Sequence, residues 1–324
     1  MDFDAQIMSR CIQIAQNGAY YVAPNPMVGA VLVSPNGTIF AEGWHKQYGG
    51  PHAEVNCFAD ADKRSVPDEL LHQSTLYVSL EPCSHYGHTP PCAELIIRKG
   101  IKRVVVGLLD PNPLVAGNGV KMLRNAGIEV TVGVLETECR DLNKRFLCLQ
   151  EKHRPYVTLK WAQTADGFMD GEISSPFTKR LVHEIRAMNM AIMVGTNTVL
   201  NDNPKLLTTH WAGRHPLRVT VDRHHRIPKG AKIFSDDAET LVYRDNTDWE
   251  FILKDLASRG VHSIMVEGGP TLLKHILSTG IYDELHIEVG PALWGQQGTK
   301  APEITLPVAP TAVIDGHRLY VIKH

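Results

Sequence analysis

The chain has 324 residues, which is too long for one ordinary hydrophobic core and predicts two domains. Apolar residues make up 43% and charged residues 21%, as in globular proteins, and the formal net charge of -2 excludes a general attraction to nucleic acid. The acidic N-terminus has no apolar core, which argues against a secretion signal, and no apolar run is long enough to span a membrane. Six cysteines in a chain of this length do not suggest a disulfide scaffold. We therefore expect a cytoplasmic enzyme.

The first 50 residues predict a helix and a β-hairpin. Apolar residues recur at helical spacing near the N-terminus, and a Pro-Asn-Gly turn separates two short strand-like runs. The expected elements are a helix over 3–15 and strands over 30–34 and 38–43. Asn25 lies in a Pro-Asn-Pro turn before the first strand, where capping the turn is its ordinary role.

One histidine and two cysteines have the pattern of a metal site. His52, Cys83 and Cys92 offer one imidazole and two thiolates, which leaves a tetrahedral zinc an open fourth position for water. Glu54 lies two residues past His52, close enough to shuttle a proton without joining the metal. This H-x-E…P-C arrangement is typical of zinc deaminases, in which zinc-activated water attacks an amino-bearing ring carbon and the carboxylate is general acid/base. The alternative is that these side chains merely pack, which the complete motif with its flanking prolines disfavours.

Further elements are expected around the motif. Cys92 should open a helix, whose N-terminus favours a thiolate. Four helices are expected: one that begins at 52, one that begins at 92, one over 120–125 and one over 136–150. Strands are expected over 76–80, 104–109 and 128–132. The remaining cysteines are expected to be small, mostly buried side chains: Cys11, Cys57, Cys139 and Cys148. The charged segment 151–155 ends in proline and is typical of a linker, so we expect domains over 1–150 and 151–324.

Strands and helices alternate after residue 155, which predicts a largely parallel sheet covered on both faces. The expected strands span 156–162, 191–194, 217–221, 240–243 and 263–266, and the expected helices span 176–188, 251–258 and 272–278, with a polar loop over 196–204. Gly268-Gly269-Pro270 could present backbone N–H groups to a phosphate, although such turns often merely end strands. The sequence contains no G-x-G-x-x-G, so a Rossmann dinucleotide domain is not supported.

The first half resembles a known family. Eight residues separate Cys83 from Cys92, and the Pro-Cys-Ser-His…Thr-Pro-Pro-Cys wording resembles the deaminase half of the bifunctional riboflavin-biosynthesis deaminase/reductases. The resemblance implies a cytidine-deaminase-like zinc domain of α/β class. It also implies contacts to the pyrimidine or the ribose phosphate from Asn25, His45, His85, Asp110 and Asn112.

Four segments of the second half resemble the reductase half of the same family, which implies a dihydrofolate-reductase-like fold that uses NADPH. They are Leu159-Lys160…Asp166-Gly167, Arg186-Ala187, Thr198 to Pro204 and Val266 to Thr271. Residues that would line the cofactor are Ala162, Thr198, Asp202, Gly269, Pro270, Thr271, Leu272, Leu273, Lys274 and His275. Residues that would face the substrate or support its chemistry are Lys160, Arg186, Leu206 and Glu267, with Lys160, Asp202 and Glu267 as catalytic residues. Taken singly, Lys160 could be a solvated strand residue, Arg186 a surface charge and Asp202 a loop cap.

Three departures from the family pattern affect cofactor and phosphate binding. Glu172 stands where the family commonly has tryptophan, and Thr208 and Thr209 stand where an arginine often follows the Pro-x-Leu segment. His88 replaces a lysine or arginine of the cysteine motif. A neutral imidazole would hold a phosphate less firmly than a fixed cation.

The resemblance implies two consecutive reactions on a small-molecule substrate. Zinc-dependent hydrolysis would remove the 2-amino group of 2,5-diamino-6-(5-phosphoribosylamino)pyrimidin-4(3H)-one, and NADPH would then reduce the ribosyl group of 5-amino-6-(5-phosphoribosylamino)uracil to ribityl. We expect no nucleic-acid or membrane partner and expect a homo-oligomer. One alternative is a deaminase of nucleic-acid bases, which the near-neutral charge disfavours. The other is a second domain that serves only for binding or dimerisation.

Overall fold

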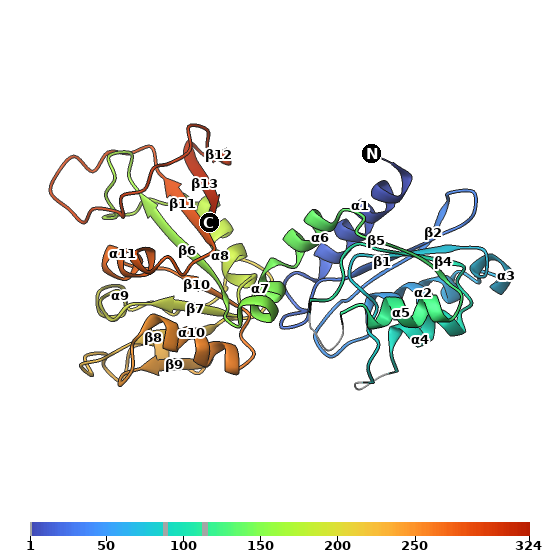
Figure 1. Ribbon diagram of the computed structural model, residues 1–324. Coiled ribbons are helices and arrows are strands. Elements are labelled where there is room, and N and C mark those ends of the chain that lie inside the picture. The colour runs from blue at the N-terminus through green and yellow to red at the C-terminus, as the bar shows by residue number, and fades with distance from the viewer. Residues whose placement is uncertain (1, 87–89, 112–115) are drawn as a thin grey trace. The chain divides into compact units, whose positions relative to one another are not determined.

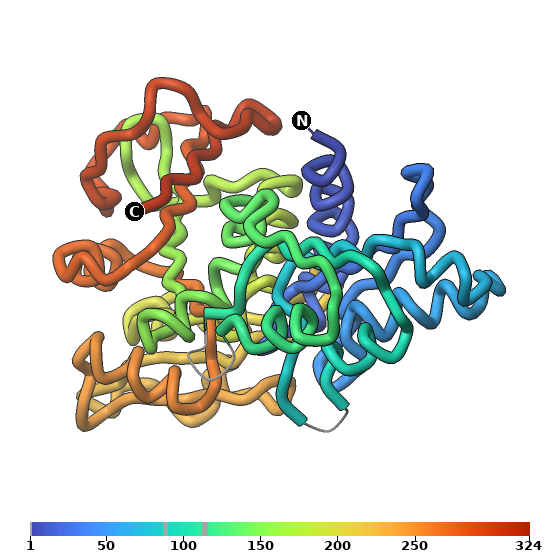
Figure 2. Tube along the Cα trace, turned by 45° about the vertical axis from the view of Figure 1, so that its right-hand side comes forward, coloured from blue at the N-terminus to red at the C-terminus, as the bar shows by residue number. Residues whose placement is uncertain are grey.

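Two separate β-sheets organise the chain, one in each of the units that its internal contacts define, Met1–Lys152 and His153–His324 (Figure 1). The computed structural model describes residues 2–86, 90–111 and 116–324. The chain completes the first unit before it enters the second (Figure 2). In the described ranges, no helix combines the length and the apolar character needed to cross a membrane.

The described part of the first unit forms a five-stranded mixed sheet in the order β2-β1-β3-β4-β5. Its strands are β1 (Gly29–Val33), β2 (Ile39–Trp44), β3 (Thr75–Val78), β4 (Arg103–Val106) and β5 (Glu129–Val132). β1 runs antiparallel to β2 and β3, as a hairpin requires, whereas β3, β4 and β5 run parallel and are joined by helical crossovers. Four of the five strands lie within two residues of their expected bounds, and β4 ends three residues earlier than expected.

Helices cover both faces of this sheet because side chains alternate along each strand. On β1, Ala30 and Leu32 pack with α2 (Ala53–Lys63), whereas Val31 and Val33 pack with α1 (Phe3–Ala15). The first face also receives α3 (Asp68–Leu71), α4 (Cys92–Arg98) and α5 (Asn118–Asn125), and the second receives α6 (Glu136–Leu142) and α7 (Lys144–Lys152). The unit is therefore a three-layer α/β/α structure. The four cysteines outside the motif, Cys11, Cys57, Cys139 and Cys148, are buried as expected.

The single helix expected over 136–150 is wrong, because the chain breaks at Asn143. Asn143 is only 2% exposed, and its side chain forms two hydrogen bonds with the backbone of Met27. Its Oδ1 atom accepts from the Met27 N–H at 2.8 Å, and its Nδ2 atom donates to the Met27 carbonyl at 2.9 Å. This contact joins the end of the unit to the turn that carries Asn25, and it has no signature in local helical spacing.

In the described residues, the second unit forms an eight-stranded sheet in the order β12-β13-β11-β6-β10-β7-β8-β9. Its strands are β6 (Tyr156–Gln163), β7 (Ala191–Val194), β8 (Leu217–Val221), β9 (Thr240–Tyr243), β10 (Ser263–Val266), β11 (Glu284–Val289), β12 (Ala312–Ile314) and β13 (His317–Lys323). The six strands from β11 to β9 in this order are parallel, and β13 runs antiparallel to both β11 and β12. The parallel sheet agrees with the expectation.

Strands β11 to β13 were not anticipated from the sequence. The pattern of β11 is obscured by two buried carboxylates, Glu284 and Glu288. Tyr156 donates its hydroxyl to Glu284 at 2.7 Å, and Ser174 donates to Glu288 at 2.6 Å. These bonds compensate the burial of each charge, so a segment with charged residues can still be an interior strand.

The helices of the second unit are α8 (Pro176–Ala187), α9 (Thr196–Asp202), α10 (Trp249–Ser258) and α11 (Pro270–Thr279). Residues of α10 and α11 pack with alternate residues of β6, β7 and β10 in one core cluster, and Val199 of α9 packs with Ile192 and Val194 in another. The polar loop expected over 196–204 is therefore wrong for its first part. The buried Val199 anchors a helix whose threonine and asparagine residues have low helix propensity.

The linker expected over 151–155 is shorter in the structure and spans 153–155, because α7 continues to Lys152 and β6 begins at Tyr156. Arg154 in this connection is fixed to the second unit by a bidentate ion pair with Asp283, with nitrogen–oxygen distances of 2.5 and 2.8 Å. Asp283 also accepts from the Val157 N–H at 2.9 Å.

Gly43 on β2 allows α2 to approach the sheet. A methyl group at this position would lie 2.2 Å from the backbone nitrogen of Cys57 and 2.6 Å from the carbonyl oxygen of Ala53. Because both atoms belong to the backbone, Gly43→Ala must displace the helix, and we expect the free energy of unfolding of the first unit to fall by about 1–3 kcal/mol.

Urea unfolding of the whole chain measures this effect. Gly230→Ala is the control, because an added methyl group there meets no heavy atom within 4 Å. Equal unfolding midpoints for Gly43→Ala and the unmodified chain would show that α2 does not depend on this close approach.

Candidate functional site

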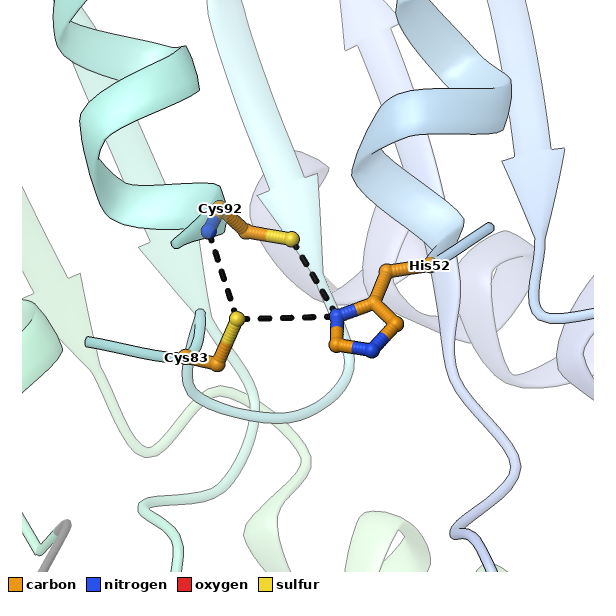
Figure 3. A group of neighbouring side chains, drawn as sticks. All are labelled: His52, Cys83 and Cys92. Carbon is orange, nitrogen blue, oxygen red and sulfur yellow. Dashed lines mark hydrogen bonds between the residues drawn. The ribbon is translucent and has the colours of Figure 1, made fainter. Parts of the chain in front are cut away.

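Three ligand atoms from three elements converge in the first unit (Figure 3). His52 immediately precedes α2, Cys83 lies in the segment after β3, and Cys92 is the first residue of α4. His52 Nδ1 lies 3.5 Å from Cys83 Sγ and 3.3 Å from Cys92 Sγ, and all three ligand atoms lie within 4.8 Å of one another. Tetrahedral zinc, with bonds of roughly 2.0 Å to nitrogen and 2.3 Å to sulfur, separates neighbouring ligand atoms by roughly 3.5–3.8 Å. The side chains therefore fit zinc without rearrangement of the backbone.

The two thiols differ in their affinity for a proton. Hydrogen bonds from Cys92 and His52 lower the pKa of Cys83 to about 4, and the backbone N–H of Cys92 also donates to Cys83 Sγ at 3.2 Å. The hydrogen bond to Cys83, together with burial, raises the pKa of Cys92. Cys83 is thus the first of the pair to become a thiolate, which is the form that binds metal.

Glu54 lies on the first turn of α2 beside this group and is only 3% exposed. Burial, reinforced by the negative charge of Cys83, raises the pKa of Glu54 to about 7. A carboxyl group with a pKa near the working pH can both accept and release a proton. Among the described residues, the group with metal-site geometry contains His52, Cys83 and Cys92.

Asn25 and His45 form a fixed pair beside the three ligands. His45 Nδ1 lies 2.9 Å from the carbonyl oxygen of Pro51, which can only accept, so Nδ1 carries the proton. Nε2 then accepts from Asn25 Nδ2 at 3.0 Å, which also orients the asparagine amide. Burial lowers the pKa of His45 and keeps it neutral, and its ring lies 5.8 Å from that of His52.

The remaining predicted substrate contacts of the first unit differ in their exposure to solvent. His85 is exposed and Asp110 is half-buried. Asn112 lies outside the described residues, as does His88, which replaces a lysine or arginine of the family's cysteine motif. Glu81 holds the Asp110 segment, a role that the sequence analysis missed. Its buried carboxylate accepts backbone N–H groups of Asp110, Gly117 and Val120 at 3.2, 2.9 and 3.2 Å. The Glu-Pro-Cys motif is the only sequence signal for this residue.

A cavity of about 1710 Å³ occupies the second unit. Twelve of the predicted residues line it: Lys160, Ala162, Arg186, Thr198, Asp202, Leu206, Glu267, Gly269, Pro270, Thr271, Leu272 and His275. Leu273 and Lys274 do not line it, because Leu273 is buried in the core and Lys274 is exposed to solvent. The twelve lining residues come from strands and helices that are far apart in the sequence. No local sequence pattern could show that they lie together.

The loops at the carboxyl ends of β7 and β10 form one side of the cavity, as is usual for ligand sites in parallel sheets. The Gly269 N–H donates to Thr198 Oγ1 at 3.3 Å. Gly268 has a φ of +127°, and a methyl group there would lie 2.9 Å from the same oxygen, so the two loops require glycine at this approach. α11 begins at Pro270, and its N-terminus is suited to an anion.

The cavity lining also contains an ion pair between two predicted residues, one on α8 and one directly after β10. Arg186 Nη2 lies 3.0 Å from Glu267 Oε2, and Arg186 Nη1 donates to the Leu207 carbonyl at 2.7 Å. Both side chains are largely buried. Glu172, which stands in place of a tryptophan, lines the cavity as an exposed residue paired with Lys179.

Two family models match the chain. The cytidine and deoxycytidylate deaminase zinc-binding region matches residues 1–108, and the RibD C-terminal domain matches residues 155–308. The riboflavin biosynthesis proteins RibD of Aquifex aeolicus and Escherichia coli are 39% and 35% identical to the chain. The alignments cover 91% and 90% of this chain, respectively, and 89% of each relative.

Solved structures show the same likeness. The Thermotoga maritima diaminohydroxyphosphoribosylaminopyrimidine deaminase/5-amino-6-(5-phosphoribosylamino)uracil reductase is 35% identical, with a TM-score of 0.88 over 99% of this chain and 98% of its own. Acinetobacter baumannii RibD is 33% identical, with a TM-score of 0.88 over 99% of each chain.

The geometry of His52, Cys83 and Cys92 predicts about one zinc per chain in the purified protein. Cys83→Ser should reduce the bound zinc at least tenfold, because it removes a thiolate ligand. Cys148→Ser, at a buried cysteine outside the group, should retain the metal. Elemental analysis of the three proteins tests this, and iron in place of zinc, or an active protein without metal, would contradict it.

Proposed function

Since the chain belongs to the family of the riboflavin biosynthesis protein RibD, we propose that residues 1–150 form its deaminase domain and residues 151–324 its reductase domain. It is a bifunctional enzyme of riboflavin biosynthesis that combines a zinc-dependent deaminase with an NADPH-dependent reductase. The observation that carries this conclusion is the presence in one chain of the complete His52, Cys83 and Cys92 group with Glu54, followed by the cavity of the second unit.

In the first reaction, water replaces the 2-amino group of 2,5-diamino-6-(5-phosphoribosylamino)pyrimidin-4(3H)-one, and ammonia leaves. His52, Cys83 and Cys92 would hold a zinc ion, whose chemistry is to lower the pKa of water toward neutrality and so supply the nucleophile. Glu54 takes one proton from the attacking water and delivers it to the ring nitrogen. It then transfers the proton of the new hydroxyl group to the 2-amino group, which leaves as ammonia. Its pKa of about 7 suits both transfers.

The neutral Asn25–His45 pair orients the pyrimidine in this proposal. The hydrogen bond between them fixes the Asn25 amide, so its polar atoms meet the ring with little loss of side-chain entropy. Asp110, held through Glu81, and the exposed His85 contact the phosphoribosyl group, together with Asn112. Binding of this remote group helps to position the reacting carbon.

In the second reaction, a hydride reaches C1' of the ribosyl group of 5-amino-6-(5-phosphoribosylamino)uracil, and a proton reaches the ring oxygen as the ring opens to ribityl. NADPH supplies the hydride. Thr198, Asp202 and the start of α11, at Gly269 to Leu272 and at His275, hold this cofactor, with Ala162 beside it. Lys160 lines the same cavity and is the proposed proton donor, while Arg186, Leu206 and Glu267 face the substrate.

The proposed partners follow from this chemistry. The ligands are small molecules, without nucleic acid or membrane, and we expect a cytoplasmic homo-oligomer. The net charge of -2 supports the exclusion of nucleic acid.

The two proposed sites use separate residues and should fail separately. Glu54→Gln should keep zinc but lower ammonia release by about two orders of magnitude, because it removes the general acid/base, while reduction of the deaminated substrate continues. Asp202→Asn and Glu267→Gln should leave ammonia release intact and lower NADPH oxidation at least tenfold.

Both reactions are measured for every variant, with ammonia release and the loss of NADPH absorbance as readouts. Glu69→Gln, an exposed carboxylate on α3, is the control and should change neither rate. If the unmodified chain releases ammonia but never oxidises NADPH with the deaminated substrate, the second unit is a binding module and not a reductase.

A further inference from the structure

Two histidines that the sequence analysis did not single out lie side by side in the cavity of the second unit. His183 belongs to α8, and His210 follows the Leu206–Thr209 segment. Their ring centroids are 4.7 Å apart, and the rings meet edge to face. Both residues line the cavity, as do Arg186, Leu206 and Glu267.

The backbone fixes the proton of His183. Its Nδ1 atom accepts the N–H of Thr209 at 3.1 Å and lies 3.5 Å from the N–H of His210. Nδ1 must therefore be unprotonated, so the neutral ring carries its hydrogen on Nε2. Burial, together with the positive charge of Arg186 and the neighbouring His210, lowers the pKa of His183 to about 4, against the opposing effect of Glu267. His183 is thus a neutral N–H donor at any pH near 7.

Lys160 and His275 line the cavity and already have proposed roles in proton transfer and cofactor binding; the other basic side chains of its described lining fall into two groups. Arg223 and Arg226 form one group, next to α9 and its proposed cofactor residues, where Arg226 donates to Asn197 at 2.8 Å. The other group contains Lys179, His183, Arg186 and His210, next to the proposed substrate residues Leu206 and Glu267.

The permanent cations of the second group already have partners. Lys179 pairs with Glu172, and Arg186 pairs with Glu267. Within this group of four described residues, the two imidazoles are the donors that are not paired with a carboxylate.

We propose that His183 and His210 form the subsite for the phosphate group of the reductase's substrate. This rests on the proposed function, because it is the phosphoribosyl substrate of the second reaction that brings a phosphate to this side of the cavity. His183 donates from Nε2 to a phosphate oxygen, His210 contacts the same group, and Arg186 contributes long-range charge while it stays paired with Glu267. Because His183 is a neutral donor and both Lys179 and Arg186 are already paired, this subsite is weaker than one built on a free guanidinium.

Kinetics with two substrates distinguish this role from a purely structural one. NADPH oxidation by the whole chain is measured with 5-amino-6-(5-phosphoribosylamino)uracil and with the same molecule lacking its phosphate. His183→Ala should raise the KM for the phosphorylated substrate about tenfold or more, the scale of a lost hydrogen bond to a charged group. It should leave the KM for NADPH and the kcat/KM for the dephosphorylated substrate within about twofold of the unmodified chain.

His215 provides a matched control. Its Nδ1 atom accepts the Thr208 N–H at 3.3 Å, much as His183 accepts that of Thr209, but His215 does not line the cavity. His215→Ala should therefore change neither substrate's KM. If His183→Ala impairs both substrates equally, the imidazole only supports the 207–210 segment and the proposal is overturned.

A gain-of-function variant keeps the proposal testable even if His183→Ala fails to fold. Thr209→Arg retains the backbone N–H that His183 accepts and adds a guanidinium beside both imidazoles. It should lower the KM for the phosphorylated substrate several-fold and leave that for the dephosphorylated substrate unchanged. An equal effect on both substrates, or no effect on either, overturns the subsite. Absence of NADPH oxidation by the unmodified chain with both substrates overturns the proposed function itself, together with the subsite that rests on it.

Discussion

Three ligand atoms on three separate elements must meet around one position, and this requirement constrains most of the first unit. His52 precedes α2, Cys83 follows β3 and Cys92 begins α4, so the packing of two helices on the sheet determines the distances among them. Gly43 brings α2 close to the sheet, and Glu81 secures the segment that follows β4. The site is therefore a property of the whole packed unit, and the short motifs only supply its donors.

The chemistry of this site was predictable because its motifs are short and its residue types are restricted by zinc. His52 and Glu54 are two residues apart, and the helix that starts between them gives each side chain its direction. The parallel sheet of the second unit was predictable for a similar reason, since continuous apolar runs alternated with helical spacing. In both cases the signal lies within a few consecutive residues.

What escaped prediction depends on contacts between distant residues. Glu284 and Glu288 hid an interior strand because their partners, Tyr156 and Ser174, lie more than a hundred residues earlier in the chain. α9 forms despite poor intrinsic propensity because Val199 is buried by the strands around it. The pairing of Arg186 with Glu267 likewise has no local signature, so the sequence could suggest both residues as substrate contacts without showing that they bind each other.

The break at Asn143 has a consequence for how such proteins can be recombined. Asn143 holds both polar backbone atoms of Met27, two residues from Asn25, although the two positions are 116 residues apart in the chain. If the deaminase half is divided at a point between these two stretches, the Met27 turn is separated from Asn143, which supports it. A chimera with a crossover between residues 28 and 142 would inherit the turn from one parent and its anchor from the other. Because Asn143 binds backbone atoms of Met27, such a chimera keeps this contact only if the parent that supplies position 143 has asparagine there.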